Sequence, residues 1–238
     1  PSLVNLSCID GAWKVGAATP VAGIKDNQEL KNELPGLSEA SGLIGSDQIQ
    51  NRASLGGNLC TASPGADTVP SLIVNGATAV IVSKAGTRTM PVADVVTGPG
   101  STSLKSGEFV VEFVIERPPP RTADAYQRFI PRTEMDIAVV DAAARITLDE
   151  SGQCTGVSIA IGAAAPTVVR VPVAEKALMG KLIDDEILKE VMAAASEACD
   201  PIDDKRGTKE YRRQVAGVLA KRVVLKAVER AEKRGGSS

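Results

Sequence analysis

The residues best suited to chemistry lie in one stretch, residues 49–67, which reads IQNRASLGGNLCTASPGAD. The adjacent Gly56 and Gly57 allow positive φ angles and carry no Cβ to obstruct a group that approaches the backbone. Backbone N–H groups exposed in such a bend form a concave nest for an anion, typically a phosphate. Hydrogen-bonding side chains surround the glycines: Asn58, Thr61, Ser63 and Asp67. The stretch therefore predicts a loop that cradles a nucleotide, although Gly-Gly-Asn alone favours an ordinary hairpin or loop turn.

Several other kinds of chemistry are excluded by the composition. The sequence contains no histidine, which removes histidine acid–base catalysis, Ser-His-Asp triads and most zinc sites. Its four cysteines lie far apart and form no CxxC pair: Cys8, Cys60, Cys154 and Cys199. We therefore expect four reduced thiols in a cytoplasmic protein, no metal site and no catalytic side chain. A bound cofactor would have to supply any chemistry.

The chain is long enough to bury a core, and that core must be built from aliphatic residues. Only 3% of the 238 residues are aromatic, so Val, Ile, Leu and Ala must fill the interior. A net charge of −2 gives no basic footprint for nucleic acid. No apolar run approaches the roughly 20 residues that span a bilayer, and the first residues lack a signal-peptide pattern. The sequence opens at Pro1, without a methionine and in strand-like residues, so we expect a fragment of a longer protein.

Short strands and helices must position the glycine stretch in the first half of the chain. The predicted elements are strands at 3–6, 13–17, 77–83 and 88–90, helices at 22–30 and 66–74, and helical turns within 30–43. A long loop rich in Gly, Ser, Thr and Pro follows at 91–107. Residues 108–116 are nearly apolar on both faces, which indicates a strand buried in a sheet.

Three consecutive prolines at 118–120 form the best domain boundary, because they fit neither a helix interior nor a central strand. We therefore predict an α+β protein with domains at 1–118 and 121–234. The second domain should contain strands at 125–130, 137–148 and 154–163, followed by helices at 172–179 and 187–198 and a long helix that Thr208 caps.

Two motifs carry a resemblance to a known family. Residues 49–67 resemble the second FAD-binding motif of the molybdenum hydroxylase flavoproteins, the medium subunits of xanthine dehydrogenases and aerobic carbon monoxide dehydrogenases. Residues 126–138 are similar to the family's segment beside the flavin ring, and residues 122–230 resemble its C-terminal domain throughout. The resemblance implies a PCMH-type FAD-binding subdomain followed by an antiparallel sheet packed with helices.

The resemblance also implies roles for individual residues. Ser54, Leu55, Gly56, Gly57 and Asn58 would wrap the phosphate and ribityl part of FAD, and Thr61 and Asp67 would lie near the flavin and its sugar. Arg128 would stand at the pyrimidine edge, where a cation stabilises negative charge on the reduced cofactor. Val110 and, less closely matched, Ile44 would supply apolar contacts to the cofactor. In relatives that use NAD, the loop with Arg132, Glu134 and Asp136 borders the acceptor's approach, although these residues could be only structural here.

Two departures from the family pattern stand out. The family carries a first FAD motif, an Ala-Gly-Gly-rich loop, some tens of residues before the position that matches Pro1. The resemblance therefore implies that the first subdomain is missing and that half of the pyrophosphate cradle is missing with it. In addition, Asp141 follows an Ala-Val-Val run where relatives often have a glycine.

The implied function is that of the FAD-carrying electron-transfer subunit of a molybdenum hydroxylase. Electrons from a molybdopterin site on a large subunit would pass through [2Fe–2S] clusters on a small subunit to FAD on this chain, in a heterotrimer, and then to NAD, a quinone or oxygen. Substrate would be oxidised on another chain. The alternatives are a structural or assembly fragment that does not retain FAD, and a stand-alone flavin oxidoreductase.

Overall fold

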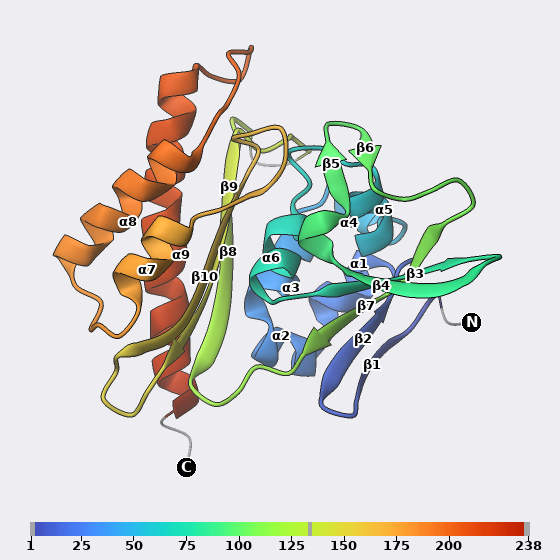
Figure 1. The fold of residues 1–238 in the computed structure, drawn as a ribbon, viewed down its shortest axis with the longest axis horizontal. Helices are drawn as coiled ribbons and strands as arrows, with labels where there is room; N and C mark the ends of the chain where they lie inside the picture. Colours follow the sequence, from blue (N-terminus) through green and yellow to red (C-terminus); the bar gives the residue numbers. More distant parts are fainter. Residues whose placement is uncertain (1–2, 133–134, 236–238) are drawn as a thin grey trace.

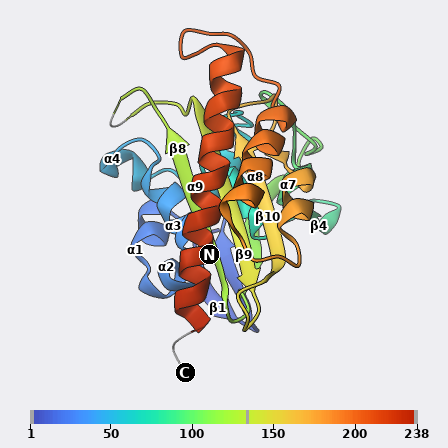
Figure 2. The same cartoon turned by 90° about the vertical axis from the view of Figure 1, so that its left-hand side faces the viewer.

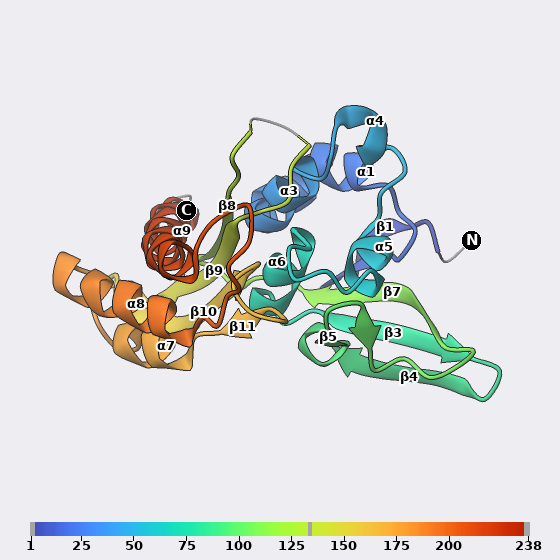
Figure 3. The ribbon, with the colours of Figure 1, turned by 90° about the horizontal axis from the view of Figure 1, so that it is seen from above.

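The computed structural model describes residues 3–132 and 135–235, which form two antiparallel β-sheets with helices between and beside them (Figure 1). Viewed from above, four layers follow one another: the first sheet, a group of short helices, the second sheet and three outer helices (Figure 3). This arrangement confirms the predicted α+β class.

The first sheet holds five strands, in the order β1 (Leu6–Ile9), β2 (Ala12–Gly16), β7 (Phe109–Glu116), β3 (Thr78–Ser83) and β4 (Gly86–Pro91). The predicted buried strand at 108–116 is thus β7, in the centre of the sheet. One face of the sheet carries Trp13, Ile81 and Phe113, all buried, into a core that it shares with the short helices.

Six short helices cover that face: α1 (Val21–Asp26), α2 (Gln28–Glu33), α3 (Pro35–Gly42), α4 (Asp47–Gln50), α5 (Leu55–Cys60) and α6 (Thr68–Val74). The single helix predicted at 22–30 is wrong, because the chain breaks at Asn27. The Asn27 side chain accepts a hydrogen bond from the Leu30 backbone N–H at 2.8 Å and so begins α2 as its N-cap.

The second sheet has four strands, in the order β11 (Val169–Arg170), β10 (Cys154–Gly162), β9 (Val140–Leu148) and β8 (Thr122–Phe129). The outer helices α7 (Pro172–Leu178), α8 (Asp185–Ala198) and α9 (Lys209–Gly235) cover one face (Figure 2). The opposite face packs on α3 and α6, where Tyr126 and Ala143 enter the core of the first sheet. The second sheet is therefore buried on both faces.

The free edge of β8 is covered by side chains from two helices. Glu39 on α3 accepts a hydrogen bond from the Tyr126 backbone N–H at 3.1 Å. From α9, Arg230 donates to the Asp124 carbonyl oxygen at 2.9 Å and Arg234 donates to the Thr122 carbonyl oxygen at 2.6 Å. Glu39 also pairs with Lys226 and Arg230 of α9, so the two helices are joined across the strand edge.

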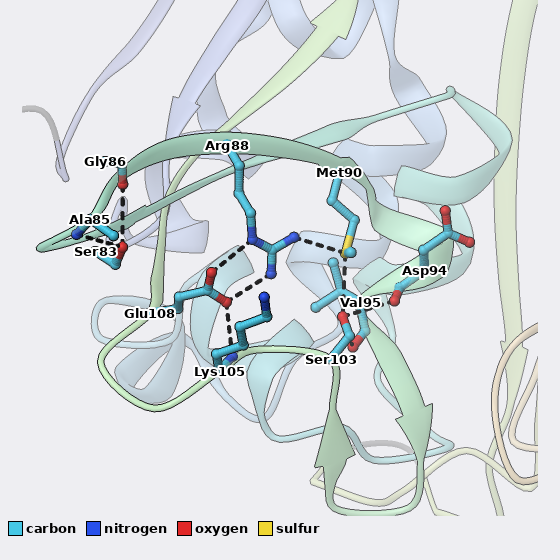
Figure 4. Close-up of polar contacts among 10 residues, drawn as sticks. All are labelled: Ser83, Ala85, Gly86, Arg88, Met90, Asp94, Val95, Ser103, Lys105 and Glu108. Atoms are coloured by element: carbon cyan, nitrogen blue, oxygen red, sulfur yellow. Dashed lines mark hydrogen bonds and ion pairs between the residues drawn. The ribbon is translucent and has the colours of Figure 1, made fainter.

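The long loop predicted at 91–107 contains some regular structure. A 3₁₀ turn, η1 (Val92–Asp94), leads into a small hairpin of β5 (Val96–Gly98) and β6 (Ser101–Thr102). Figure 4 shows how the segment after this hairpin is fixed to β4: both Nε and Nη2 of Arg88 donate to the Glu108 carboxylate at 2.8 Å. The Arg88 hydrogen bonds, followed by the Lys105 backbone N–H, lower the pKa of Glu108 to about 2.

Candidate cofactor site

The predicted glycine loop is the start of a helix. Gly56 and Gly57 lie in the first turn of α5 and neither has a positive φ, so that part of the prediction is wrong. Ser54 is the N-cap, and its hydroxyl accepts a hydrogen bond from the Gly57 backbone N–H at 3.2 Å. The nest of exposed backbone amides predicted for this stretch is therefore wrong as well, because the backbone N–H groups of Gly56 and Asn58 donate to the carbonyl oxygens of Ala17 and Ser54.

The two adjacent glycines are needed for different reasons. The backbone N–H of Gly56 donates to the Ala17 carbonyl oxygen at 3.0 Å, and a Cβ on Gly56 would lie only 2.6 Å from that oxygen. Gly57 is exposed, and a Cβ there would meet only the Ser54 hydroxyl, at 3.4 Å. Alanine favours a helix by about 1 kcal/mol over glycine, so a glycine at position 57 costs helix stability. No packing contact with the described residues excludes a Cβ there. An external group that comes close to the backbone would give a reason for the glycine.

The polar side chains of α5 are partly occupied by contacts within the chain. The Asn58 side-chain oxygen accepts hydrogen bonds from the Thr68 backbone N–H at 3.0 Å and from its hydroxyl at 2.7 Å, which fixes α5 to the start of α6. The Thr61 hydroxyl donates to the Gly57 carbonyl oxygen at 2.7 Å, and Thr61 is exposed. Within the described residues, the Asn58 amide nitrogen has no partner and can donate to a ligand.

Asp67 and Arg128 form a buried ion pair next to this helix. Arg128 Nη1 lies 3.0 Å from both carboxylate oxygens of Asp67, and the Tyr126 hydroxyl donates to one of them at 2.9 Å. The Arg128 side chain is only 4% exposed. Burial raises the pKa of Asp67, against the opposing effects of the Arg128 cation and the Tyr126 hydroxyl. Two residues that the sequence analysis placed separately, 61 positions apart, thus act as one group.

Asp141 lies beside this ion pair, and the sequence analysis assigned it no role. It is fully buried and stands directly opposite Arg128 in the pairing of β8 with β9. Burial, followed by the charge of Asp67, raises its pKa well above the ordinary value. Its mismatch with the family's glycine was the one signal in the sequence that pointed to this position.

The other predicted residues lie in or against the first core or at the surface. Val110 is buried on β7 opposite Ile81, within the first core, and Ile44 packs against the same core while half-buried. Arg132 and Asp136 pair with each other at 3.2 Å at the surface, and Arg132 is the main cause of a lowered pKa at Asp136. Glu134 lies outside the described residues.

A cleft of about 490 Å³ opens beside Arg128, between α3 and α9. Its lining is strongly basic, with Lys25, Lys31, Arg222, Lys226 and Arg230 around the single carboxylate of Glu39. Sequence reasoning missed Glu39 and Arg230, which meet only because α9 folds back over the first half of the chain. Among the residues described, no three metal-ligating side chains gather, and no helix is long and apolar enough to cross a membrane.

Comparison with protein families gives two matches along the chain. Residues 1–118 match the FAD-binding domain in molybdopterin dehydrogenase, and residues 125–227 match the CO dehydrogenase flavoprotein C-terminal domain. The chain is 30% identical to the 6-hydroxypseudooxynicotine dehydrogenase complex subunit alpha of Paenarthrobacter nicotinovorans, over 97% of this chain and 78% of that protein. It is 31% identical to the carbon monoxide dehydrogenase medium chain of Afipia carboxidovorans, over 92% and 75%.

Solved structures agree with these sequence matches. A carbon monoxide dehydrogenase from Hydrogenophaga pseudoflava superimposes with a TM-score of 0.92 at 30% identity, over 97% of this chain and 79% of that one. Quinoline 2-oxidoreductase from Pseudomonas putida 86 gives a TM-score of 0.88 at 29% identity, over 97% and 79%. The chain therefore belongs to the family of FAD-binding medium subunits of molybdopterin-dependent dehydrogenases.

Proposed function

We propose that this chain carries FAD as the electron-transfer subunit of a molybdenum hydroxylase. Bound FAD would supply the redox chemistry that the side chains of this chain lack. Molybdopterin and [2Fe–2S] clusters would belong to a large and a small partner subunit, in a cytoplasmic heterotrimer. Family membership supports this proposal, and the relatives' names describe medium chains and subunits of dehydrogenase complexes.

The observation that carries the proposal is Gly57. It is exposed in the first turn of α5, and nothing in the packing of the chain requires the absence of its Cβ. A glycine in this exposed position lets an external group approach the backbone without meeting a Cβ. With the Ser54 cap, the free Asn58 amide nitrogen and the exposed Thr61 beside it, this surface fits the phosphate and ribityl part of FAD.

Arg128 and Asp67 would tune the cofactor electrostatically. Held almost completely buried by two contacts to Asp67, Arg128 presents a cation that needs little reorganisation when charge develops nearby. Asp67 compensates part of that charge, so the pair would give a moderate positive field. Ile44 and Val110 would complete the apolar surroundings. We further propose that residues 1–118 hold the cofactor and residues 121–234 supply Arg128 and the outer helices.

A visible spectrum tests the proposal directly. The full-length protein is purified by gel filtration and examined for the two bands of oxidised flavin near about 370 and 450 nm. Retention of these bands at one FAD per chain is expected. A colourless protein that is folded and stays colourless on incubation with FAD would contradict the proposal.

The two glycines supply a matched pair of variants. In Gly57→Ala, the added methyl group points outward, so FAD should be lost while the unfolding midpoint stays the same or rises. In Gly56→Ala, the methyl group collides with Ala17, so the fold itself should be destabilised. Retention of FAD in Gly57→Ala would remove the main support for the site.

A further inference from the structure

Asp141 lies on β9, between β8 and β10, and a glycine on β10 leaves space for its side chain. Its Cα pairs with that of Arg128 on β8 and with that of Gly162 on β10. A Cβ on Gly162 would overlap the Asp141 Oδ1 atom, so the carboxyl group fills the space that this glycine leaves. The carboxyl group therefore leans toward β10, while Arg128 lies on the other neighbouring strand, β8, and acts on Asp141 together with Asp67 through its charge.

Both residues of the Arg128–Asp141 strand pair carry buried polar atoms without a partner among the described residues. Neither carboxyl oxygen of Asp141 makes a well-formed hydrogen bond to the described residues, although Asp141 is fully buried. Arg128 Nε is likewise buried without an acceptor, because Arg128 contacts Asp67 through Nη1. Native proteins leave few buried polar groups unpaired, and each one requires an explanation. Here an unused donor and an unused acceptor belong to directly opposed residues.

Asp141 and Arg128 share their surroundings with other ionisable groups. Asp67, at the start of α6, and Tyr126 and Arg128, on β8, are the ionisable groups that face Asp141. On β10 the facing residue is Gly162, and on the opposite face of the sheet Arg212 of α9 is occupied by the Val139 and Ala163 carbonyl oxygens. One nearby cation thus serves two carboxyl groups.

Only one of these two carboxyl groups has the partners that stabilise a negative charge. Asp67 accepts hydrogen bonds from the Tyr126 hydroxyl and from Arg128, as an ionised group requires. At Asp141, burial and the Asp67 charge raise the pKa, and the Arg128 cation and the Gly162 backbone amide oppose them only in part. Ionising Asp141 beside Asp67 would bury a second negative charge, and each buried ion costs several kcal/mol.

We propose that Asp141 is a positioning residue for Arg128: as a neutral acid it leaves Arg128 to Asp67, and as a carboxylate it accepts a second contact from Arg128 Nε. The change between the two states is a proton dissociation from the Asp141 carboxyl group to solvent, and no electrons are transferred. Arg128 is thereby held either by one carboxylate or between two.

The link to the cofactor rests on the proposed function. If FAD lies beside Arg128, ionisation of Asp141 adds a negative charge close to it and makes reduction less favourable. The midpoint potential of bound FAD should therefore fall more steeply with rising pH in the wild type than in Asp141→Asn. The asparagine keeps the shape of a neutral acid but cannot ionise.

Nuclear magnetic resonance of the chain without FAD tests the first part. The resonances of the Arg128 side-chain Nε–H and of the Asp141 carboxyl carbon are followed against pH in the wild type, in Asp141→Asn and in Asp124→Asn. Asp124 is the matched control, since it is a buried carboxyl group on β8 with its own partners, Gly36 and Asn75. The Arg128 resonance should move together with the Asp141 titration in the wild type and in Asp124→Asn, and should lose this movement in Asp141→Asn.

An Arg128 resonance with the same pH dependence in Asp141→Asn, or an Asp141 carboxyl that is ionised at neutral pH, would overturn the proposal. Redox titration of the FAD-loaded complex then tests the coupling, with the same three proteins. A flatter pH dependence in Asp141→Asn alone is expected, and equal slopes in all three would refute the coupling. If no variant holds FAD, the proposed function fails, while the resonance measurement still decides between the two states of Arg128.

Discussion

Two buried aspartates on neighbouring strands of the second sheet differ in almost everything except burial. Both lie against a glycine: a Cβ on Gly36 would come within 2.7 Å of the Asp124 carboxyl group, and one on Gly162 would overlap that of Asp141. Asp124 accepts hydrogen bonds from the Gly36 backbone N–H at 2.9 Å and from the Asn75 amide at 2.7 Å. Among the described residues, Asp141 makes no well-formed hydrogen bond of this kind.

The difference separates a structural carboxyl group from a responsive one. Asp124 connects β8 to α3 and to the end of α6, and its partners belong to the backbone and to a buried amide, which do not titrate. Burial raises the pKa of both groups. At Asp124 this rise is opposed by hydrogen bonds that also fix the position of the carboxyl group. Asp141 instead borders the Arg128 pair, so its charge state has a neighbour that can respond.

The largest effect should come from removing the structural group. In Asp124→Ala, the Gly36 N–H and the Asn75 amide lose their buried acceptor, and each unsatisfied group costs about 1–3 kcal/mol. We expect the free energy of unfolding to fall by about 2–6 kcal/mol in total. Urea unfolding followed by circular dichroism measures it. A loss below about 1 kcal/mol would show that Asp124 does not join the two parts of the molecule as described.

A smaller loss of unfolding free energy should follow when the space that the Asp141 carboxyl group occupies is filled. Gly162→Ala forces the Asp141 carboxyl group out of its position, and overpacking of this kind costs about 1–3 kcal/mol. In an Asp141→Ala background the same substitution should cost much less, because the colliding atom is gone. A double-mutant cycle of unfolding free energies measures the difference. Equal costs in both backgrounds would mean that the clash is not with Asp141.

The smallest effect should be a change in how the free energy of unfolding depends on pH. Asp141 holds its proton to a higher pH in the folded state than in the unfolded state, where its pKa is about 3.9. Its contribution to stability is therefore complete in acid and is lost as the pH rises from that value through the raised folded pKa. Asp141→Asn should remove this loss, which amounts to at most about 1.4 kcal/mol for each pH unit.

The comparison is made between wild type and Asp141→Asn at several pH values, because Asp124 also has a raised pKa and its contribution is present in both proteins. The difference in unfolding free energy between the two proteins should grow as the pH rises. A difference that is constant with pH would indicate that Asp141 is ionised throughout.

Elements with a strong local pattern were predictable from the sequence. The central strand β7 is continuous and apolar, and α9 has a regular stripe with a capping threonine. Elements decided by one side chain or by a tertiary contact were not predictable. The break at Asn27 depends on its cap, and α5 forms because Gly56 packs on Ala17. A run of small residues with two glycines carries no helical pattern of its own.

The members of the candidate site remain predictions, and the contacts between them could not be read from the sequence. The residues of α5, Asp67 and Arg128 were chosen through resemblance to a family, and the ion pair between Asp67 and Arg128 joins positions 61 apart. Such pairing depends on the stacking of the second sheet against α6, which no local pattern encodes. Asp141 was noticed only as a departure from the family, because the role proposed for it depends on tertiary surroundings that no local pattern encodes.

The covered edge of β8 limits how this subunit can meet other proteins. An exposed strand edge is a template onto which another chain can add a strand, in assembly or in aggregation. Here Glu39, Arg230 and Arg234 occupy the outward backbone groups of Tyr126, Asp124 and Thr122, and the opposite edge of the sheet is the two-residue strand β11. Addition of a strand from another chain is therefore blocked at these three positions of β8.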